Sequence, residues 1–372
     1  SVGKTGVEAA ANFTLMSVHQ ELLQRLQGII EGRDPKGNDV VLTIDMDIQS
    51  IAGDLLGSAK GAVVVMEPST GRVLAMQAYP DFDPNTVAAD WEYLTADEES
   101  PLVNRATQGL YPPGSTFKII TALAAMEYMP DWQTFTVNCS GEASFENKVI
   151  HCYNNKAHGT VDMQEAMAES CNCYFAALAQ KIGAENLSTV MKRCGILSEY
   201  QFDLAYSQSV MHLNKDSTES ELVETAIGQG RTSASVLYMA MLISAVANDG
   251  IMMRPYVIDH VQYANGEAGT TTVPEKLLQI CTSEEADTLN TMLISVVDSG
   301  TGTAARNSGV TVAGKTGTAE NATGKDHSWF VGYAPAEDPK VAIAVLIENS
   351  DYGKATPIAG KVLQVALEET AE

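Results

Sequence analysis

The spacing of apolar residues predicts strands at both ends of the chain and helices between them. Near the start, Val40 to Ile44 predicts a strand and Ile48 to Ala59 predicts a helix. Gly61 to Glu67 and Arg72 to Ala78 predict two further strands. The tight turn Pro68-Ser69-Thr70-Gly71 lies between them, so this part of the chain is interpreted as a hairpin.

After the hairpin the pattern becomes irregular and then mainly helical. Pro80 to Gly109 is rich in turn residues and acids, which predicts a long loop that places the following helix. Helices are predicted at Ser115 to Met129, Asp162 to Ile182, Glu185 to Arg193, Ser235 to Asn248 and Ser283 to Val297. Strands return at Val310 to Lys315, Ser328 to Tyr333 and Lys340 to Glu348, and a last helix is predicted at Pro357 to Glu369. This order implies a sheet assembled from both ends of the chain, with a helical lobe inserted.

Composition and charge exclude several classes of protein. A chain of 372 residues with 45% hydrophobic and 19% charged residues has the composition of an ordinary globular protein. No apolar run approaches the roughly 18 residues needed to span a bilayer. A formal net charge of −24, with no stripe of Lys and Arg, argues against nucleic acid as a partner.

Six cysteines are too sparse for a disulfide scaffold, but one group of them is notable. Cys139 and Cys152 flank a predicted hairpin or loop, and His158 follows shortly. A disulfide, a zinc site that uses these three residues with Cys173 as a candidate fourth ligand, and free thiols all remain open. The spacing differs from the tight C-x-x-C of common zinc sites, which favours free thiols. Cys171 and Cys173 lie two apart on a predicted helix, so they are not expected to pair with each other.

Ser115 lies one helical turn before Lys118, at a predicted helix start. Pro112, Pro113 and Gly114 interrupt regular structure just before it, and a run of good helix formers follows. Residues three apart share one face of a helix, so the Lys118 amine can reach the Ser115 hydroxyl. A lysine whose pKa is lowered by burial can remove the serine proton. The pair is therefore a candidate nucleophile and base.

Two later segments complete a known pattern. Ser170-Cys171-Asn172 follows a helical run, and Lys315-Thr316-Gly317-Thr318 follows an apolar run. Together with the S-x-x-K element at Ser115, they resemble the signature of penicillin-binding proteins and class A β-lactamases. The resemblance implies an α/β chain of the α+β type. In that fold an antiparallel sheet flanked by helices packs against an all-helical subdomain, and the active site lies at their junction.

Further segments make the resemblance narrower. The chain is similar to the transpeptidase domain of monofunctional class B penicillin-binding proteins. The segments that carry this likeness are Leu42 to Asp45, Pro80 to Asn85, Gly228-Gln229-Gly230, Arg254-Pro255, Asp298 to Ala304 and His327 to Pro335. Residues 39–372 are then expected to form one transpeptidase domain, with the helical subdomain inserted at about 115–250.

The resemblance also implies a cellular setting. Class B enzymes normally carry an N-terminal membrane anchor and a non-catalytic pedestal domain. Residues 1–38, which include a predicted amphipathic helix over 7–30, are interpreted as a linker or a remnant of the pedestal. The chain is expected to be a fragment from the extracytoplasmic face of a bacterial membrane, where it would work in a membrane-bound cell-wall synthesis complex. The alternative is a soluble cytoplasmic protein.

By resemblance, the reaction is the cross-linking of peptidoglycan. Ser115 would attack the penultimate D-alanine carbonyl of a stem peptide, and an amine of a neighbouring stem would then take the acyl group. Lys118 would be the base, Ser170 a proton relay, and Asn172 would hold Lys118 or the substrate backbone. Ser170 and Asn172 can also act simply as a helix cap. β-Lactam antibiotics would acylate Ser115.

The K-T-G segment would bind the substrate. Lys315 would supply positive potential, and the hydroxyls of Thr316 and Thr318 would bind the terminal carboxylate, with Arg231 as a further candidate cation. Gly314 and Gly317, which lack side chains, would let the substrate lie against the strand. The backbone N–H groups of Ser115 and Thr318 would form the oxyanion hole. No metal or other cofactor is required for this chemistry.

Two other functions remain open at this stage. With water as acceptor, the same site would give a D,D-carboxypeptidase or a β-lactamase. The latter needs a base for deacylation, and Glu185-Asn186-Leu187 only partly resembles such an element. A non-enzymatic β-lactam sensor or scaffold is the third alternative, although the intact motifs weigh against it.

Overall fold

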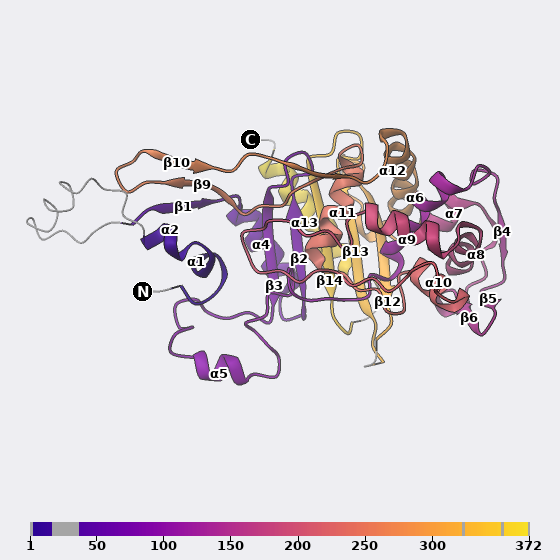
Figure 1. Ribbon diagram of the computed structural model, residues 1–372, viewed down its shortest axis with the longest axis horizontal. Coiled ribbons are helices and arrows are strands. Elements are labelled where there is room, and N and C mark those ends of the chain that lie inside the picture. Colours follow the sequence, from indigo (N-terminus) through magenta and orange to yellow (C-terminus); the bar gives the residue numbers. More distant parts are fainter. Residues whose placement is uncertain (1–2, 17–36, 322–323, 351–352, 371–372) are drawn as a thin grey trace, which may run out of the picture.

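A central antiparallel sheet unites the two ends of the chain. The computed structural model describes residues 3–16, 37–321, 324–350 and 353–370. The sheet has five strands in the order β12-β13-β14-β2-β3, and every neighbouring pair is antiparallel (Figure 1). Its strands are β2 (Gly61–Met66), β3 (Val73–Tyr79), β12 (Ala313–Ala319), β13 (His327–Ala334) and β14 (Val341–Ile347).

Both faces of this sheet are buried, which explains why β2 and β14 are apolar throughout. Val64 pairs with Ala344 and packs under α11 (Val236–Ala247). Val63 pairs with Val345 and belongs to a second core on the opposite face. That face is covered by α4 (Met46–Leu56) and α13 (Ala355–Glu369). Successive side chains of a strand point to opposite faces, so each strand supplies both cores.

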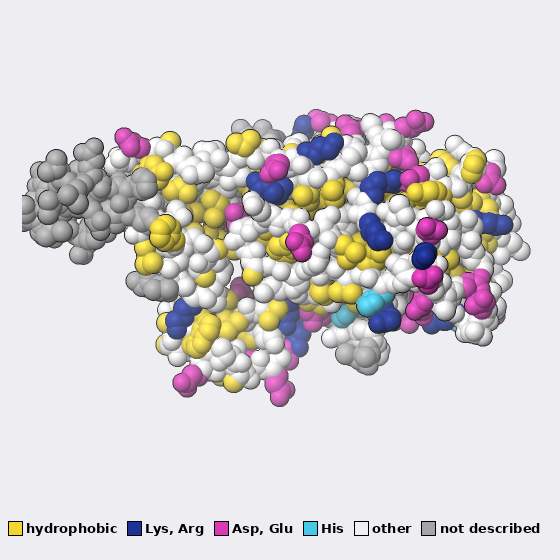
Figure 2. Space-filling view, viewed as in Figure 1, with side chains coloured by type: hydrophobic (Ala, Val, Ile, Leu, Met, Phe, Trp, Pro, Cys, Tyr) yellow, Lys and Arg dark blue, Asp and Glu magenta, His cyan; other side chains and the backbone are white. Residues whose placement is uncertain are grey.

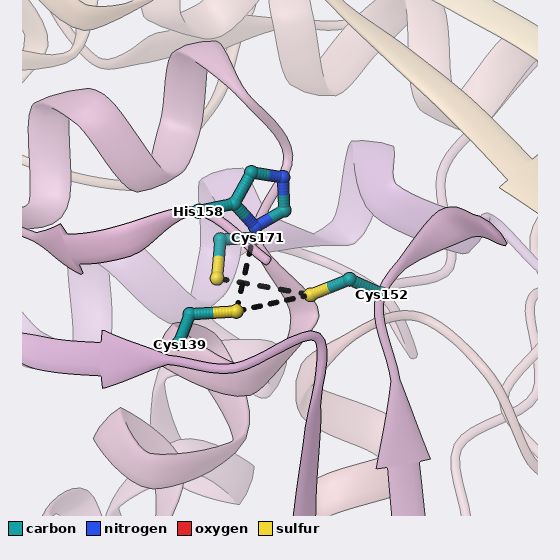
Figure 3. A group of neighbouring side chains, drawn as sticks. All are labelled: Cys139, Cys152, His158 and Cys171. Atoms are coloured by element: carbon teal, nitrogen blue, oxygen red, sulfur yellow. Dashed lines mark hydrogen bonds between the residues drawn. The ribbon is translucent and has the colours of Figure 1, made fainter. Parts of the chain in front are cut away.

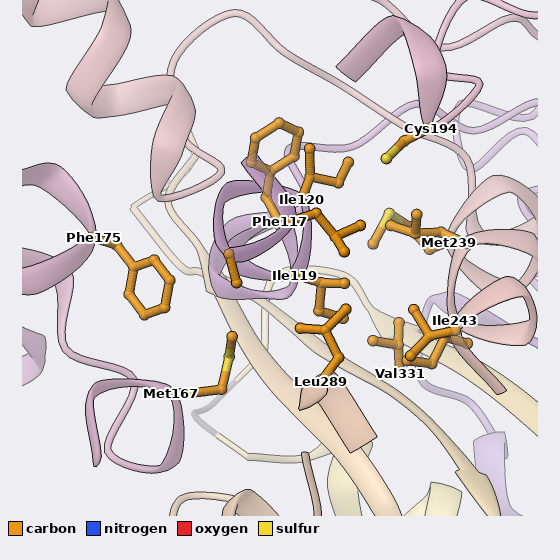
Figure 4. Packing of buried hydrophobic residues seen from close by; sticks show 14 of the residues in the cluster. Phe117, Ile119, Ile120, Met167, Phe175, Cys194, Met239, Ile243, Leu289 and Val331 are labelled. Atoms are coloured by element: carbon orange, nitrogen blue, oxygen red, sulfur yellow. The ribbon is translucent and has the colours of Figure 1, made fainter. Parts of the chain in front are cut away.

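The second lobe is built around a buried helix, α6 (Lys118–Tyr128), which begins just after the short 3₁₀ turn Gly114–Phe117. Ile119, Ile120 and Phe117 lie at the centre of the packing in Figure 4, between residues of the sheet and of the other helices. Burial on all sides suits the almost wholly apolar sequence of this helix. The other helices of the lobe are α7 (Met163–Ala168), α8 (Asn172–Ile182), α9 (Ala184–Arg193) and α10 (Glu219–Ala226).

Several helices begin at residues that the sequence marks as caps. The Asp162 carboxylate accepts a hydrogen bond from the Glu165 N–H, and the Glu165 carboxylate accepts one from the Asp162 N–H, so α7 starts with a capping box. Thr282 and Glu285 do the same at the start of α12 (Ser283–Asp298). Each such cap satisfies backbone donors that the first helical turn leaves unpaired.

The remaining elements lie around these two lobes. β1 (Asp39–Leu42), β9 (Ile258–Gln262) and β10 (Ala268–Thr271) form a small sheet at the end of the elongated molecule opposite the helical lobe (Figure 1). Further short elements are α1 (Gly6–Ala10), α2 (Asn12–Met16), α5 (Trp91–Ala96), β8 (Ile251–Met253), β11 (Lys276–Gln279) and the 3₁₀ turn Thr303–Ala305. No helix of the described ranges is long and apolar enough to cross a membrane.

Most predicted elements are present, with four corrections. The lobe is not all-helical, because it contains the strands β4 (Val137–Cys139), β5 (Glu142–Phe145), β6 (Lys148–His151) and β7 (Gly159–Val161) and a 3₁₀ turn at Tyr153–Asn155. The predicted hairpin at 140–151 is confirmed as β5 and β6. The predicted loop 80–109 contains α5, and the strand predicted at 310–315 begins at Ala313.

The fourth correction is the helix predicted from Asp162 to Ile182, which is broken into α7 and α8. Ser170 adopts a φ of +57° at the break, a conformation that is uncommon for a residue other than glycine. Most of the helix predicted over 7–30 lies outside the described residues. On the face drawn in Figure 2, the described Lys and Arg side chains lie scattered among acidic ones and form no stripe.

Candidate active site

Ser115 lies in the 3₁₀ turn that leads into α6, on the wall of a cavity of about 440 Å³. The Thr116 hydroxyl donates a hydrogen bond of 2.6 Å to the Pro113 carbonyl, which fixes this turn. Gly114 has a φ of +55°, which favours glycine. A Cβ there would also lie only 2.4 Å from the Thr318 carbonyl oxygen, so the nucleophile turn packs directly on β12.

Lys118 is fully buried behind Ser115. Its Nζ donates to the Ser170 carbonyl at 2.7 Å, to Asn172 Oδ1 at 2.6 Å and to Ser170 Oγ at 3.2 Å. The Phe175 ring lies 5.4 Å away on another side. Burial lowers the pKa of Lys118 to about 8, because the charged amine has lost its water. An amine of this kind can release a proton near neutral pH and then serve as a base.

Lys315 approaches Ser170 from the sheet. Its Nζ donates to Ser170 Oγ at 2.9 Å and to the Thr316 carbonyl at 3.2 Å. Burial and the charge of Lys118 together hold the pKa of Lys315 well below its usual range. Two buried ammonium groups beside one hydroxyl repel each other, so this arrangement favours a state in which at least one amine is neutral.

Asn172 ties the helical lobe to this network. Its Oδ1 accepts the bond from Lys118, and its Nδ2 donates to the His151 carbonyl at 2.8 Å. Asn172 is the first residue of α8, and the cap of that helix is the Cys171 sulfur, which accepts from the Tyr174 N–H. The predicted cap at this turn is therefore supplied by Cys171 rather than by Ser170 or Asn172.

β12 is an edge strand whose outer side borders the cavity. The Thr318 carbonyl accepts from Gln229 Nε2 at 3.4 Å, so it points away from β13. In an antiparallel strand the N–H and C=O of one residue point to the same side, and the Thr318 N–H therefore faces this edge as well. Gly114 lies against the same residue, which brings the backbone of the nucleophile turn beside the Thr318 N–H.

Gly314 and Gly317 both lie where a side chain would clash with the rest of the protein. A Cβ on Gly314 would lie 2.4 Å from the Phe330 ring, and one on Gly317 would lie 2.9 Å from Trp329 Cβ and 3.0 Å from Thr116 Cγ2. The absence of a side chain at these positions therefore permits close packing of β12 on β13 and on the nucleophile turn. The role predicted for both glycines, to let a substrate lie against the strand, stays a prediction.

The cavity brings most of the predicted site residues together. Its lining includes Ser115, Ser170, Asn172, Thr316, Gly317 and Thr318. Lys118 and Lys315 lie behind these residues and are fully buried. Arg231 is exposed outside the lining, and Glu185 lies in α9, away from it.

Thr301 lines this cavity, although sequence reasoning gave it no role. It shares a hydrogen bond of 2.6 Å with the Thr316 hydroxyl, so three threonines line the cavity where the motif predicts a bound carboxylate. Gln229 lines the cavity as well, in the G-Q-G turn that the resemblance places near the cleft. The signal for Thr301 was present in the S-G-T-G element, but its spacing alone does not say that this loop reaches the site.

The cysteine positions contradict one of the three alternatives left open by the sequence, the disulfide. Cys139 Sγ and Cys152 Sγ are 3.6 Å apart, whereas a disulfide requires about 2.05 Å, so the two are not bonded. A group that could hold a metal ion does exist. It contains Cys171 in place of the predicted Cys173, and its members are Cys139, Cys152, His158 and Cys171 (Figure 3).

Comparison with known proteins assigns the fold and motifs to a family. The family model described as the penicillin binding protein transpeptidase domain matches residues 61–364. Peptidoglycan D,D-transpeptidase PbpA of Mycolicibacterium smegmatis is 34% identical over 98% of this chain and 80% of its own length. Peptidoglycan D,D-transpeptidase MrdA of Acinetobacter baumannii is 31% identical over 95% of this chain but only 58% of its own length.

Solved structures support the same family assignment. The D,D-transpeptidase domain of a peptidoglycan glycosyltransferase from Eggerthella lenta superposes with a TM-score of 0.90 at 37% identity, covering 98% of this chain and 87% of that one. Penicillin-binding protein A of M. tuberculosis, as its penicillin G acyl-enzyme complex, superposes with a TM-score of 0.88 at 31% identity, covering 99% and 89%. This chain therefore belongs to the penicillin-binding protein transpeptidase family and has the mixed helix and antiparallel-sheet fold of that family.

Proposed function

We propose that this protein is a peptidoglycan D,D-transpeptidase that works through an acyl-enzyme on Ser115. The observation that supports it most is the convergence of Lys118 and Lys315 on the Ser170 hydroxyl, beside Ser115 and in the wall of one cavity. This arrangement provides a buried base and a proton relay in contact with each other, and it places the relay in the wall of the cavity that the nucleophile also lines.

In the acylation step, Ser115 Oγ attacks the carbonyl carbon of the penultimate D-alanine, and its proton passes to the neutral Lys118 amine. The oxyanion that forms is bound by the N–H groups of Ser115 and Thr318. The peptide C–N bond then breaks. The leaving nitrogen takes a proton from Ser170, which is replenished by a lysine, and the terminal D-alanine departs.

The K-T-G strand holds the donor peptide. Its outer side borders the cavity, where the substrate adds as a further strand through main-chain hydrogen bonds. The hydroxyls of Thr316, Thr318 and Thr301 bind the terminal carboxylate. Lys315 lies behind them, and its protonated form adds positive potential.

In the second step an amine of a neighbouring stem peptide attacks the ester carbonyl and releases Ser115. Three carboxylates line the same cavity, at Glu169, Glu320 and Asp326. They attract a cationic acceptor into the site, which favours transfer to an amine over transfer to water. β-Lactams enter the same cavity and acylate Ser115.

We also propose the setting of this activity. The substrate is assembled outside the cytoplasmic membrane, so the domain acts at the extracytoplasmic face, joined through residues 1–38 to an anchored and pedestal-bearing N-terminal region. There it would work in a membrane-bound cell-wall synthesis complex. The family membership of the chain supports both proposals.

Intact-protein mass after mixing with benzylpenicillin tests the function. One stable adduct, mapped to the peptide that contains Ser115, is expected. A short-lived adduct with turnover of the antibiotic would instead identify a hydrolase, and a stable adduct on another residue would refute the nucleophile. Release of D-alanine from a stem-peptide mimic, with and without an added amine, separates transpeptidase from carboxypeptidase.

A further inference from the structure

The Gln229 side chain reaches the outer edge of β12, where a substrate strand is proposed to bind. Its Nε2 donates a hydrogen bond of 3.4 Å to the Thr318 carbonyl, and the residue lines the active-site cavity. Within the described ranges of the chain, the carboxamide makes no other hydrogen bond. A primary amide of the protein thus occupies a backbone acceptor that faces the substrate.

This acceptor is the one that a substrate needs. An added strand bonds to the backbone groups of β12 that point outward, and in an antiparallel sheet these belong to every second residue, here Thr316 and Thr318. The Thr316 carbonyl already accepts a buried bond of 3.2 Å from Lys315 Nζ. On this part of the edge, a donor N–H is therefore directed to the Thr318 carbonyl.

The geometry of strand addition also says which N–H of the donor is involved. The Thr318 N–H is proposed to bind the oxygen of the scissile carbonyl. Every pair of neighbouring strands in this sheet is antiparallel, and in such a pair two facing residues exchange both of their hydrogen bonds. The N–H that meets the Thr318 carbonyl therefore belongs to the acyl residue itself, the penultimate D-alanine.

The Gln229 side chain can leave this position while its backbone stays in place. The Gly228 carbonyl accepts from the Gly114 N–H at 2.9 Å, and the Gln229 N–H donates to the Glu224 carbonyl at 2.9 Å. A second cavity of about 460 Å³ has Gln229 and His151 in common with the first. Rotation of the side chain alone would carry the carboxamide from the strand edge into this second cavity.

We propose that Gln229 is a specificity-determining residue, which competes with the donor N–H for the Thr318 carbonyl. In the free enzyme the carboxamide occupies the carbonyl and protects the edge of the sheet. A donor with an N–H on its acyl residue displaces the carboxamide, whereas a ligand without this N–H leaves it bound. Gln229 thereby sets how much that N–H contributes to acylation. This inference rests on the proposed function, because it concerns the donor of that reaction.

Two variants separate the hydrogen bond from the bulk of the side chain, Gln229→Ala and Gln229→Met. Both remove the N–H donor, and methionine keeps nearly the length of glutamine. Two β-lactams are the probes. The acylamino group of benzylpenicillin carries an N–H that corresponds to that of the acyl residue, and imipenem has a hydroxyethyl group there instead. The second-order rate constant of acylation is measured for each by intact-protein mass.

The decisive quantity is the ratio of the benzylpenicillin rate constant to the imipenem rate constant, in which a general effect on the site cancels. This ratio should rise about 3-fold to 10-fold over the wild type in both variants, the effect of removing one competing neutral hydrogen bond. Two donor mimics that have either an amide N–H or an ester oxygen on the acyl residue should show the same change in their relative acylation rates.

Gln208→Ala is the matched control. Gln208 Nε2 also donates to a backbone carbonyl, that of Leu197, but Gln208 lies outside the lining of the active-site cavity. The ratio in this variant should stay within about 1.5-fold of the wild type.

The other possible outcomes contradict the proposal in different ways. An unchanged ratio in both Gln229 variants would overturn it, and so would an equal rise in Gln208→Ala. A rise in Gln229→Ala alone would assign the effect to the bulk of the side chain and overturn the role of the hydrogen bond. Equal slowing of both β-lactams would make Gln229 a structural support without selectivity. A wild type that neither β-lactam labels would instead refute the proposed function.

Discussion

Lys118 and Lys315 donate hydrogen bonds to one and the same atom, the Ser170 hydroxyl oxygen, at 3.2 Å and 2.9 Å. One lysine comes from the helical lobe and the other from the edge strand of the sheet. A single hydroxyl thus joins the two halves of the fold at the point where the reaction is proposed to occur. Movement of either half would therefore change the protonation of both amines.

Replacing the nucleophile should abolish the adduct and leave the fold intact. Ser115→Ala removes one half-buried hydroxyl from a turn that is held by Thr116 and Gly114. We expect no covalent adduct by intact mass and a midpoint of thermal unfolding close to that of the wild type. Labelling that persists in this variant would mean that another residue is the nucleophile.

Acylation should depend on pH through Lys118. Burial lowers the pKa of this amine to about 8, and only the neutral amine can accept the serine proton. The neutral fraction increases with pH, so the acylation rate should rise about tenfold per unit below pH 8 and level off above it. Stopped-flow acylation from pH 6 to about 9.5 measures this.

Lys118→Ala should lower the plateau rate about 10²-fold to 10⁴-fold and remove the rise near pH 8. The affinity of the initial non-covalent complex should change much less. Equal losses in both quantities would assign Lys118 to binding rather than to proton transfer.

The two glycines of the G-Q-G turn should differ in their tolerance of a methyl group. Both have a positive φ, of 75° at Gly228 and 77° at Gly230. A Cβ on Gly228 would lie 1.8 Å from the Gly114 carbonyl oxygen, whereas the nearest contact at Gly230 is 3.4 Å. Gly228→Ala should therefore displace the nucleophile turn and slow acylation about 10²-fold.

Gly230→Ala is the control for that experiment, because it carries the same backbone strain without the clash. It should lose about 1 kcal/mol of unfolding free energy and acylate at close to the wild-type rate. Similar rates in the two variants would show that the contact between these turns does not position Ser115.

A buried ion pair should anchor the segment before the nucleophile. Glu348 Oε1 accepts from the Tyr111 hydroxyl at 2.6 Å and from Arg105 Nε at 3.0 Å. Burial and the Glu348 hydrogen bond raise the pKa of Tyr111. Glu348→Ala leaves the Arg105 charge buried without its partner, so the free energy of unfolding in urea should fall by about 3–5 kcal/mol.

Tyr111→Phe removes only one bond to a charged group and should lower the unfolding free energy by about 1.5–3 kcal/mol. The exposed pair of Lys340 and Asp338 provides the comparison, because Asp338→Asn should change it by less than about 1 kcal/mol. A loss in Glu348→Ala no larger than in Asp338→Asn would contradict the anchoring role.

The sequence predicted which motif residues come together better than it predicted the contacts that hold them in place. Ser115, Lys118 and Lys315 could be assigned because each motif fixes residue types at short spacing. The break at Ser170, where φ is positive, could not be predicted, since the side chain there contacts lysines from two other parts of the chain. In the same way, the close packing at Gly317 and the position of Cys171 beside Cys139, Cys152 and His158 depend on contacts between distant segments.

The main sheet was predictable for a different reason. Its strands β2 and β14 are buried on both faces, so their sequences are continuously apolar. The short strands β9 to β11 are partly exposed and carry mixed polar and apolar residues, and β8 is apolar but only three residues long. Without a consistent alternation of apolar and polar residues, these sequences cannot be distinguished from those of loops.

The pairing of β14 with β2 sets a condition on biosynthesis. Ile347 aligns with Gly61, so the centre of the sheet joins the first part of the domain to nearly its last. Contacts between such distant segments form late, because a long loop must close before they are made. Ser115 leaves the ribosome well before Lys315. A nascent chain therefore carries its nucleophile without the second lysine. Its Ser115 can react with penicillin only when the C-terminal third of the chain has been made.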